Sequence, residues 1–585
     1  MKNFKKYIGV IFTVLLLVIY FGYNFKINLK KKHNEALANK IPLTFELQDI
    51  TTPSQVQFKH EVSHLAKNLE NVSPWLNAVG SSISLVDLKG DGWYDIYFTT
   101  QKIGALNKYF KNNHDGTFTE ISQQLKIANV NLPFPSYRSI FIDINRDGYK
   151  DLIILSFHPK VFKNNQNKYF EEIPNHGIQN GTFYGGANLA ELDRDGKLYL
   201  IIAPYLNQNL WESNNTLNVM PDNFSDSTNG VPIQVYRIDD NFKFELDQEK
   251  LTQLNHLGWG HSVGIYDIRN TGFKDVWFPK DYSTEKLFVN QNSSYHDISN
   301  LLLQKNYGFG RNGMSIDFGD VDNDGKPLVF VSHIFEPYHK LSGNNLWKWK
   351  DQNHFEQIAD ERGVQDCGWA WGGKFVDFDN DSFLDLIVVN GFISNNTKKT
   401  YWYTTSVLDS SSSFIMKDSK NWPKMNDSSL AGYQDKCLFY NYKGEFLDIA
   451  HRTDLKLNKL DGRGVVPFDL LNNGSPGIAI VNQNNIPKIY LNKQKNKNSW
   501  IGFKFKGTKS NIDGWGTKIK IQLPGKTLTR ELEPLNGHAS QSEDRLLIGL
   551  GVDPKIQKIE VLWPSGNIQS INDFQLNKYQ TIIEK

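Results

Sequence analysis

Short apolar runs recur between residues 43 and 493, and turns rich in Gly, Asn and Asp separate them. The run "LIVV" at residues 386–389 is representative, because it is short, β-branched and preceded by an acidic turn. Runs of this length and composition predict buried strands rather than helices. Aromatic residues make up 13% of the chain and glycines number 44, which agrees with this interpretation. We therefore expect an all-β protein.

Two motifs mark these strands, and each occurs seven times. The first is an acidic loop that precedes an apolar run. The second follows each loop and consists of an apolar–aromatic pair, usually with Asn two residues later. Copies repeat at a base interval of about 50 residues, the size of a four-stranded propeller blade. The acidic loops begin at Asp87, Asp143, Glu191, Asp267, Asp320, Asp377 and Asp469.

The two ends of the repeat array predict how it closes. The seventh copy stops after "IYLNKQKN" and lacks the aromatic–acidic–Ile ending of the other copies. That ending occurs instead before the first loop, in "LTFELQDIT" at residues 43–51. An open solenoid would need polar caps rather than a split repeat. We expect a seven-bladed β-propeller over residues 43–493, closed by an N-terminal strand, and a small C-terminal β domain over residues 494–585.

Two intervals between repeats are longer than the base interval. They carry insertions at about residues 203–231 and 391–434. The second insertion is rich in Ser, Lys and Tyr, so we expect it to project from the propeller as a surface excursion.

The N-terminal segment predicts a membrane anchor. Residues 7–25 carry no charge, and lysines flank them on both sides. As a helix this segment would be about 28 Å long, close to the ~30 Å thickness of a bilayer core. We assign residues 1–32 to a cytoplasmic stub and a transmembrane helix, and residues 33–42 to a linker. A cleaved signal peptide is the alternative. Both place the propeller on the exported side, periplasmic or extracellular, while the balanced lysines leave the orientation open.

Charge and cysteine content narrow the function classes. The formal net charge is +2, so no overall field favours nucleic acid. The two cysteines, Cys367 and Cys437, are too few for a disulfide framework. They could pair with each other in an oxidising compartment.

The acidic loops have the composition of calcium loops. In the Asp377 loop, aspartates occupy every second position, and such carboxylates can supply the oxygen ligands that a hard dication needs. An EF-hand also needs Glu at position 12 and a following helix, whereas position 12 here is Val388 within a predicted strand. The sequence therefore predicts a calcium loop between two strands.

The repeats and the tail together resemble a known family. The loops followed by "DLIVV"-type strands are similar to the FG-GAP/VCBS repeats of integrin α-subunit propellers and bacterial surface proteins. The tail segments "NSWIGFKFKGTKSNIDGWGTKIKI", "GHASQSEDRLLIGLG" and "IEVLWPSGNIQ" look like the ASPIC/UnbV domain. Repeats plus this tail resemble the cartilage acidic protein family and its bacterial relatives. The resemblance implies a calcium-bearing propeller with binding roles and no settled activity.

The resemblance also implies which loop positions hold Ca²⁺: 1, 3, 5, 7 (through the main-chain carbonyl) and 9. The Asp143 and Asp377 loops match best. The Asp87 loop has a lysine at position 3 and the Asp320 loop has a leucine at position 9. For these two loops the sequence leaves two alternatives open, a calcium site and a metal-free turn. The other three loops are expected to be metal-free turns. The predicted ligands are Asp143, Asn145, Asp147, Tyr149 and Asp151; Asp377, Asp379, Asp381, Phe383 and Asp385; Asp87, Asp91, Trp93 and Asp95; and Asp320, Asp322 and Asp324.

A second candidate site lies at the predicted propeller mouth. Basic and aromatic residues precede several loops by a similar distance, so they would converge on the central axis. Such a ring could bind an anionic or sugar ligand through charge-assisted hydrogen bonds and stacking. Packing between blades is the alternative. The residues are Arg138, His261, Arg311, Trp371 and Arg463.

No motif identifies a catalytic centre. The G-x-S-x-G string at residues 260–264 is followed by a predicted strand, whereas a nucleophile elbow needs a helix there. Gln541 and Glu543 in the tail are expected in a turn or edge strand. We expect a non-catalytic recognition, adhesion or assembly module that binds a protein or glycan ligand. The alternatives are an exported enzyme acting on a glycan or similar substrate at the propeller mouth, and a scaffold whose 391–434 excursion contacts a partner.

Overall fold

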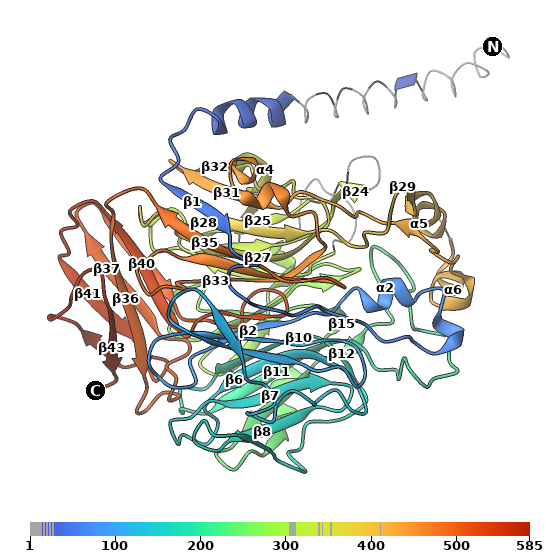
Figure 1. Cartoon of the computed structure of the whole chain (residues 1–585), viewed down its shortest axis with the longest axis horizontal. Helices are drawn as coiled ribbons and strands as arrows, with labels where there is room; N and C mark the ends of the chain where they lie inside the picture. The colour runs from blue at the N-terminus through green and yellow to red at the C-terminus, as the bar shows by residue number, and fades with distance from the viewer. Residues whose placement is uncertain are drawn as a thin grey trace.

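The computed structural model describes residues 29–302, 312–336, 340–341, 343–351, 354–409 and 411–585, together with Val14, Leu15, Val18, Gly22 and Phe25. These residues form a ring of sheets with a separate C-terminal domain on one side (Figure 1).

Seven four-stranded antiparallel units make up the ring within the described residues. In each unit the acidic loop connects the first strand to the second. The units are β2 (Ile83–Val86), β3 (Asp95–Phe98), β4 (Lys108–Asn112) and β5 (Phe118–Glu120); β6 (Ser136–Ile142), β7 (Asp151–Ser156), β8 (Lys160–Asn164) and β9 (Phe170–Glu172); β10 (Phe183–Glu191), β11 (Leu198–Leu206), β13 (Gln234–Ile238) and β14 (Phe244–Leu246); β16 (Gly264–Tyr266), β17 (Asp275–Phe278), β19 (Lys286–Gln291) and β20 (Ser294–Asp297); β21 (Ile316–Gly319), β22 (Leu328–Val331), β25 (Asn345–Asp351) and β26 (His354–Gln357); β27 (Ala370–Val376), β28 (Asp385–Asn390), β31 (Cys437–Tyr442) and β32 (Glu445–Asp448); and β33 (Gly462–Phe468), β34 (Gly477–Asn482), β35 (Lys488–Gln494) and β1 (Phe45–Asp49).

The first strands of the seven units form a closed inner ring. Each first strand contacts that of the next unit, and β33 of the last unit contacts β2 of the first. The N-terminal strand β1 completes the last unit, because it pairs antiparallel with β35 from Phe45 opposite Gln494 to Asp49 opposite Tyr490. The fold is therefore all-β and β-propeller-like, as predicted.

Burial explains why the strands read as continuous apolar runs. Every residue of β7 and of β28 is buried, because each unit packs between two neighbours and has no solvent-facing side there. Apolar residues on both faces are what such a fully buried strand requires.

The C-terminal domain consists of two packed sheets, drawn in orange to red at the left of Figure 1. Trp515, Ile519 and Phe503 are among its buried core residues. Its sheets are β40 (Arg545–Gly551), β36 (Ser499–Lys506) and β43 (Tyr579–Ile583), and β38 (Lys526–Glu531), β37 (Lys518–Leu523), β41 (Lys558–Leu562) and β42 (Ile568–Ser570).

One loop of this domain enters the ring. We call residues 532–544, which connect β38 to β40, the plug. Within the plug, β39 (Ser540–Gln541) pairs parallel with β2, so that Ile83 lies opposite Ser540. The C-terminal domain therefore adds a strand to the inner face of the first unit.

The opposite side of the ring carries a lid, formed by α2 (Ser73–Asn77) and the two insertions at 203–231 and 391–434. The second insertion, which the sequence predicts to be a surface excursion, also has an inner side that packs over the ring. Trp422 is buried there and its ring lies 5.4 Å from that of Trp75, because these large apolar surfaces pack over the ring rather than face water. The 391–434 insertion contains β29 (Asn396–Thr400), α5 (Trp402–Asp409), α6 (Ser413–Met416), η3 (Ser419–Asn421) and β30 (Ser428–Ser429).

The remaining elements are short connections at the edges of the ring. They are η1 (Lys67–Leu69), β12 (Val231–Pro232), α3 (Gln248–Gln253), β15 (Leu257–Gly260), β18 (Lys280–Asp281), η2 (Ser299–Leu302), β23 (Phe335–Glu336), β24 (Lys340–Leu341), α4 (Ala359–Arg362), η4 (Ala450–Arg452) and η5 (Asp454–Leu457).

A helix at residues 29–38 precedes the ring and is held against it. Lys30 Nζ lies 2.7 Å from the Asp360 carboxylate on α4. The anchor predicted at residues 7–25 lies outside the described residues apart from five positions. None of the helices that the structure describes is long and apolar enough to cross a membrane. Cys367 and Cys437 form a disulfide.

Candidate calcium loops and the filled channel

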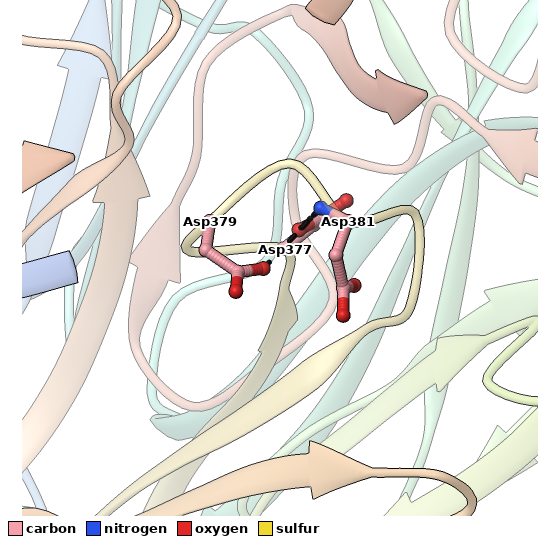
Figure 2. Close-up of side chains that lie close together, drawn as sticks. All are labelled: Asp377, Asp379 and Asp381. Carbon is pink, nitrogen blue, oxygen red and sulfur yellow. Dashed lines mark hydrogen bonds between the residues drawn. The ribbon is translucent and has the colours of Figure 1, made fainter. Parts of the chain in front are cut away.

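Three carboxylates of the Asp377 loop gather at one point (Figure 2). Asp377, Asp379 and Asp381 each offer an oxygen, and these oxygens lie within 4.8 Å of one another. The turn is shaped by bonds to its own backbone: Asp377 accepts from the Asp381 N–H at 3.1 Å and the Ser382 N–H at 2.9 Å. Asp381 accepts from the Phe383 N–H at 2.8 Å. The sequence thus folds into a turn whose acidic side chains converge.

The charge of this cluster is not neutralised by a direct ion pair within the described residues. Asp379 accepts hydrogen bonds from the hydroxyls of Thr44 and Tyr440. The nearby Lys526 donates to Ser382 Oγ at 2.5 Å rather than to a carboxylate.

Burial and mutual repulsion make ionisation of this cluster costly. Burial, and then the neighbouring carboxylates, raise the pKa of Asp377 well above its ordinary value. The same two causes raise the pKa of Asp381 to about 7. Acids crowded in this way are the environment that a hard dication stabilises.

The Asp143 loop repeats the hydrogen bonds of this turn, with the Asn145 amide at the position of Asp379, but its three acids do not converge within 4.8 Å as those of the Asp377 loop do. Asp143 accepts from the N–H groups of Asp147 at 3.1 Å and Gly148 at 2.8 Å. Asn145 donates its side-chain amide to Asp147 at 2.8 Å, which leaves its amide oxygen facing the same turn. Burial raises the pKa of Asp143 to about 6 and that of Asp151 to about 7. No salt bridge of the described residues involves these acids.

Lysines of the C-terminal domain occupy two other loops. Lys504 Nζ lies 3.0 Å from the Asp87 carboxylate. In the Asp267 loop, Lys518 Nζ lies 2.8 Å from the Asp267 carboxylate, 3.1 Å from its main-chain oxygen and 2.8 Å from Asn270 Oδ1. Lys518 thus contacts positions 1 and 4 of this loop, while Arg269 at position 3 pairs with Asp275 at position 9 at 2.9 Å.

Basic side chains of the ring and the C-terminal domain fill the Asp320 loop. Asp322 pairs with Arg362 and, at 3.0 Å, with Lys348. Arg530 donates to the main-chain oxygen of Asp320 at 3.3 Å. Protein cations therefore contact Asp322, one of the three predicted ligands of this loop.

The Glu191 loop is neutralised in the same way. Lys250 lies 2.7 Å from Asp193 and Arg237 lies 2.6 Å from Asp195. Among the other predicted ligands, Asp95 accepts from the Asn112 N–H, Asp91 from the Trp93 N–H, and Asp324 from the Lys326 N–H.

The residues predicted at the mouth converge, but they do not face solvent. Arg138, His261, Trp371 and Arg463 have exposed fractions of 0–1%. The Arg463 guanidinium lies 4.2 Å from the centre of the Trp371 ring, and the His261 ring lies 5.3 Å from it. Arg311 lies outside the described residues.

The plug fills the space between these residues. The His538 ring lies 5.1 Å from that of Trp371, and Arg138 donates to the plug carbonyls of Leu535 at 2.9 Å and Ser540 at 3.2 Å. Ser262 of the G-x-S-x-G string donates to the carbonyl of Gly537 at 2.7 Å. Arg138 and Trp371 therefore contact the chain's own tail, whereas the Arg463 guanidinium donates to the carbonyls of Ala78, Gly391, Gly462 and Phe392.

Plug side chains copy the hydrogen bonding of a strand. The Asn536 amide accepts from the Ile265 N–H and donates to the Ile265 carbonyl, both at 3.0 Å. Gln541 does the same with Phe141, both at 2.8 Å. Glu543 accepts from the Asp469 N–H at 3.1 Å. Sequence reasoning placed Gln541 and Glu543 in a turn or edge strand and missed this role. The polar string "NGHASQSED" was the available signal.

Comparisons with known proteins agree with the repeat and tail motifs. The sequence profile described as ASPIC and UnbV matches residues 507–585, and the profile described as FG-GAP-like repeat matches residues 87–154 and 143–202. Cartilage acidic protein 1 of Xenopus tropicalis is 24% identical over 136 residues, which cover 23% of this chain and 21% of that protein. The match thus spans about a fifth of the length of that relative.

Two solved structures resemble this chain at low scores. BBS1N, solved in complex with ARL6DN, has a TM-score of 0.36 and 8% identity, covering 76% of this chain and 96% of its own. The BP39L lectin from Burkholderia pseudomallei has a TM-score of 0.42 and 7% identity, covering 71% of this chain and 96% of its own. Neither score supports an argument about function. The sequence matches, however, bear out the predicted resemblance: this chain carries FG-GAP-like repeats and a C-terminal ASPIC and UnbV domain.

Proposed function

We propose that this chain is an exported, membrane-anchored β-propeller of seven blades, stabilised by Ca²⁺, that acts as a non-catalytic recognition or assembly module. One observation carries the proposal. Asp377, Asp379 and Asp381 converge within 4.8 Å, and no salt bridge of the described residues neutralises them.

The donor set suits calcium. Carboxylate and amide oxygens are the ligands of a hard cation, and extracellular modules bind Ca²⁺ with dissociation constants of about 10⁻⁴ to 10⁻³ M. The Asp143 loop offers three carboxylates and the Asn145 amide in the same turn. We restrict the proposed sites to these two loops, because protein cations contact the Asp87 and Asp320 loops.

Two features support export. The Cys367–Cys437 disulfide is of a kind that persists in oxidising compartments. The uncharged segment at residues 7–25 has the length of a membrane span.

The filled channel supports recognition on the outer surfaces. Arg138 and His261 are buried between the plug and the lid, so a substrate could reach them only if one of these segments moved away, which disfavours the alternative of an enzyme acting at the mouth. An extracellular or periplasmic protein or glycan would instead meet the outer blades, the lid or the C-terminal domain.

The test is calcium stoichiometry on the full chain, measured by equilibrium dialysis and elemental analysis at millimolar Ca²⁺. We expect about two ions per chain, and Asp379→Asn should lose one of them. The matched control is Asp322→Asn, which changes the same position of a loop that contains protein cations and should lose none. Absence of bound Ca²⁺, or equal loss in both variants, would refute the calcium assignment.

Partner capture tests the recognition role. The full chain is purified from its membranes with Ca²⁺ and again with a chelator. A partner retained only with Ca²⁺ supports the proposal, whereas turnover of a glycan by the purified chain would replace it with the enzyme alternative.

A further inference from the structure

A lysine and an aspartate lie side by side between the fifth and sixth units of the ring. Asp317 belongs to β21 and Lys374 to β27, which are the contacting first strands of these units. Lys374 Nζ lies 3.6 Å from Asp317 Oδ1, and the two side chains are 6% and 11% exposed. An amine and a carboxyl group thus meet where two separate sheets pack together.

Both residues occupy the same position of the repeat. Asp317 precedes the first acid of its loop, Asp320, by three residues, and Lys374 precedes Asp377 by three. The equivalent residues of the other five units carry no charge, so packing of the ring does not itself require a charge at this position. These five residues are Ser84, Ile140, Asn188, Gly264 and Val466.

Other buried lysines hold their acidic partners more closely. Lys250, Lys274 and Lys518 each lie within 2.8 Å of a carboxylate oxygen. At 3.6 Å, the Lys374 amine contacts the Asp317 carboxyl group but lies beyond the ordinary length of a charge-assisted hydrogen bond. The pair therefore lacks the geometry of a firm buried salt bridge.

The surroundings of this pair disfavour both charges. Burial lowers the pKa of Lys374, and Arg138 acts in the same direction, so that Asp317 and Glu533 do not restore its ordinary value. Burial likewise raises the pKa of Asp317 in spite of the nearby Lys374. Both shifts favour an uncharged amine beside an uncharged acid, which are the forms that react to give an amide.

A cavity of about 180 Å³ adjoins the pair, and Glu533 of the plug lines it together with Asp317 and Lys374. Burial raises the pKa of Glu533 to about 8, so this acid carries an exchangeable proton at neutral pH. The Phe375 N–H donates to Asp317 Oδ2 at 2.8 Å and leaves Oδ1 towards Lys374. The site thus contains a hydrogen-bond donor for one carboxyl oxygen, a proton-exchanging acid, and room for a released water.

We propose that Lys374 and Asp317 join through an amide bond between Lys374 Nζ and Asp317 Cγ, which links two neighbouring units of the ring covalently. The amine attacks Cγ while the Phe375 N–H stabilises the charge that develops on Oδ2. The N–C bond forms and the Cγ–Oδ1 bond breaks. Oδ1 leaves as water with one hydrogen from the amine and one from the acid, and Glu533 relays the proton. No oxidation state changes, so no co-reactant is needed.

Removal of the charges favours this reaction in the folded chain. An ion pair buried between two sheets bears a desolvation cost, whereas an amide carries no charge. The bond also closes the chain between residues 317 and 374, which reduces the conformational freedom of the unfolded state. The inference depends neither on Ca²⁺ nor on membrane attachment.

The test is the intact mass of the full chain, measured in reducing conditions because the Cys367–Cys437 disulfide also changes the mass. Chain collected in urea directly after synthesis is compared with the same chain after refolding. The refolded chain should be lighter by one water, and protease digestion should yield a branched peptide that joins Asp317 to Lys374. No branched peptide should join Asp267 to Lys518, which form a close buried ion pair at 2.8 Å.

Variants separate the reaction from mere proximity. Lys374→Arg and Asp317→Ala should abolish the mass loss, with melting temperature verifying that both fold. Glu533→Gln should slow the appearance of the branched peptide by about a hundredfold or more, because it removes the acid that relays the proton. An unchanged rate in this variant would overturn the role of Glu533.

The parent chain decides the proposal whatever the variants do. An unchanged mass after refolding overturns the amide bond. A loss of water that maps to an Asp–Gly sequence such as Asp147–Gly148 also overturns it, because a cyclic imide at that sequence has the same mass. Both outcomes leave the proposed function untouched, since calcium stoichiometry and partner capture are measured separately.

Discussion

The Asp377 loop and the Asp267 loop share one turn and neutralise it in opposite ways. Both begin with an aspartate that accepts hydrogen bonds from the N–H groups at positions 5 and 6 of the loop. In the Asp377 loop three acids converge without a direct ion pair in the described part of the chain. In the Asp267 loop the Lys518 ammonium sits among three oxygens. The backbone of the turn is therefore compatible with either cation.

The pKa values record the same contrast. Burial opposes ionisation of Asp267, yet Lys518, together with Lys274 and the Gly272 N–H, more than offsets burial and holds the pKa of Asp267 below its usual value. In the Asp377 loop, burial and like charges act in the same direction and raise the pKa of Asp381 to about 7. The difference teaches that Lys504 and Lys518 tie the C-terminal domain to the Asp87 and Asp267 loops, whereas the Asp377 loop, for which we propose Ca²⁺, has no such ion pair within the described residues.

Removing the lysine should have the largest effect. Lys518→Met leaves Asp267 and Glu531 buried without their common partner, at 2.8 and 3.3 Å respectively. Breaking a buried pair in this way costs about 3–5 kcal/mol. Urea unfolding should show this loss, and Ca²⁺ should restore none of it, because Arg269 remains beside Asp275. Lys520→Met on the same strand is the control, expected within about 0.5 kcal/mol of the parent. If Ca²⁺ fully restored the free energy of unfolding that Lys518→Met loses, the contrast between the Asp267 and Asp377 loops would be refuted.

The effect of removing an acid from the Asp377 loop on the stability of the chain should change sign when Ca²⁺ is added. In chelator, Asp381→Asn should raise the melting temperature, because it relieves repulsion with Asp377 and Asp379. In excess Ca²⁺ the same substitution should abolish the stabilisation that one bound ion supplies, which is about 1.4 kcal/mol at tenfold saturation. Calorimetry with and without Ca²⁺ measures both. Asp324→Asn, at the same position of a loop that contains protein cations, should show no Ca²⁺-dependent difference.

Acidification should reduce the gain from Ca²⁺. The folded pKa of Asp143 is raised to about 6 and that of Asp151 to about 7, above the unfolded value of about 3.9. Without Ca²⁺, the folded loop therefore holds protons that the unfolded chain releases, so it gains stability as pH falls from 7.5 to 5.5. After allowance for partial exposure this gain is about 1 kcal/mol, and protons then compete with Ca²⁺.

The measurement is the difference between the melting temperatures with Ca²⁺ and with chelator at each pH. This difference cancels the contribution of titrating groups that lie far from the loops. Within the Asp267 loop, Asp267 itself adds nothing in this window, because its folded pKa is lowered from an ordinary value that already lies below 5.5, whereas burial raises the pKa of Asp275 to about 6 and gives this loop a pH dependence that does not involve Ca²⁺. An equal Ca²⁺-dependent gain in melting temperature at pH 7.5 and 5.5 would contradict the competition between protons and Ca²⁺ for the loop carboxylates.

Relief of backbone strain should have the smallest effect. Ser382 has a φ of 83°, in the region that favours glycine, where the Asp143 loop has Gly148. Ser382→Gly should stabilise the chain by about 0.5 kcal/mol, since it loses only the hydroxyl contact with Lys526. Chemical unfolding with and without Ca²⁺ should show the same small gain in both, and a decrease would show that the Lys526 contact outweighs the strain.

Features that belong to the repeats could be predicted from the sequence, whereas contacts made by residues outside the repeats could not. The strand that completes the last unit was predictable, because residues 43–51 carry the ending that the seventh copy lacks. The acids of the Asp377 loop were predictable because they are neighbours in one turn. Lys504 and Lys518 were not, since they reach loops that are 417 and 251 residues away and belong to no repeat.

The filling of the channel was missed for a similar reason. Arg138 and Trp371 were expected to converge because they occupy equivalent repeat positions, and they do. Nothing periodic marks the plug residues Leu535, His538 and Ser540 as their partners. Burial of Trp422 was missed because a polar composition hides a few large apolar residues that pack inward.

The pairing of β1 with β35 has a consequence for biosynthesis. Translation produces Phe45 near the start of the chain and its partner Gln494 only after every other strand of the ring. Until then the edges of the outermost repeats are unprotected, and exposed strand edges are prone to aggregate. The nascent chain therefore needs shielding, by a chaperone or by tethering at its point of exit, for as long as the ribosome takes to reach the last repeat.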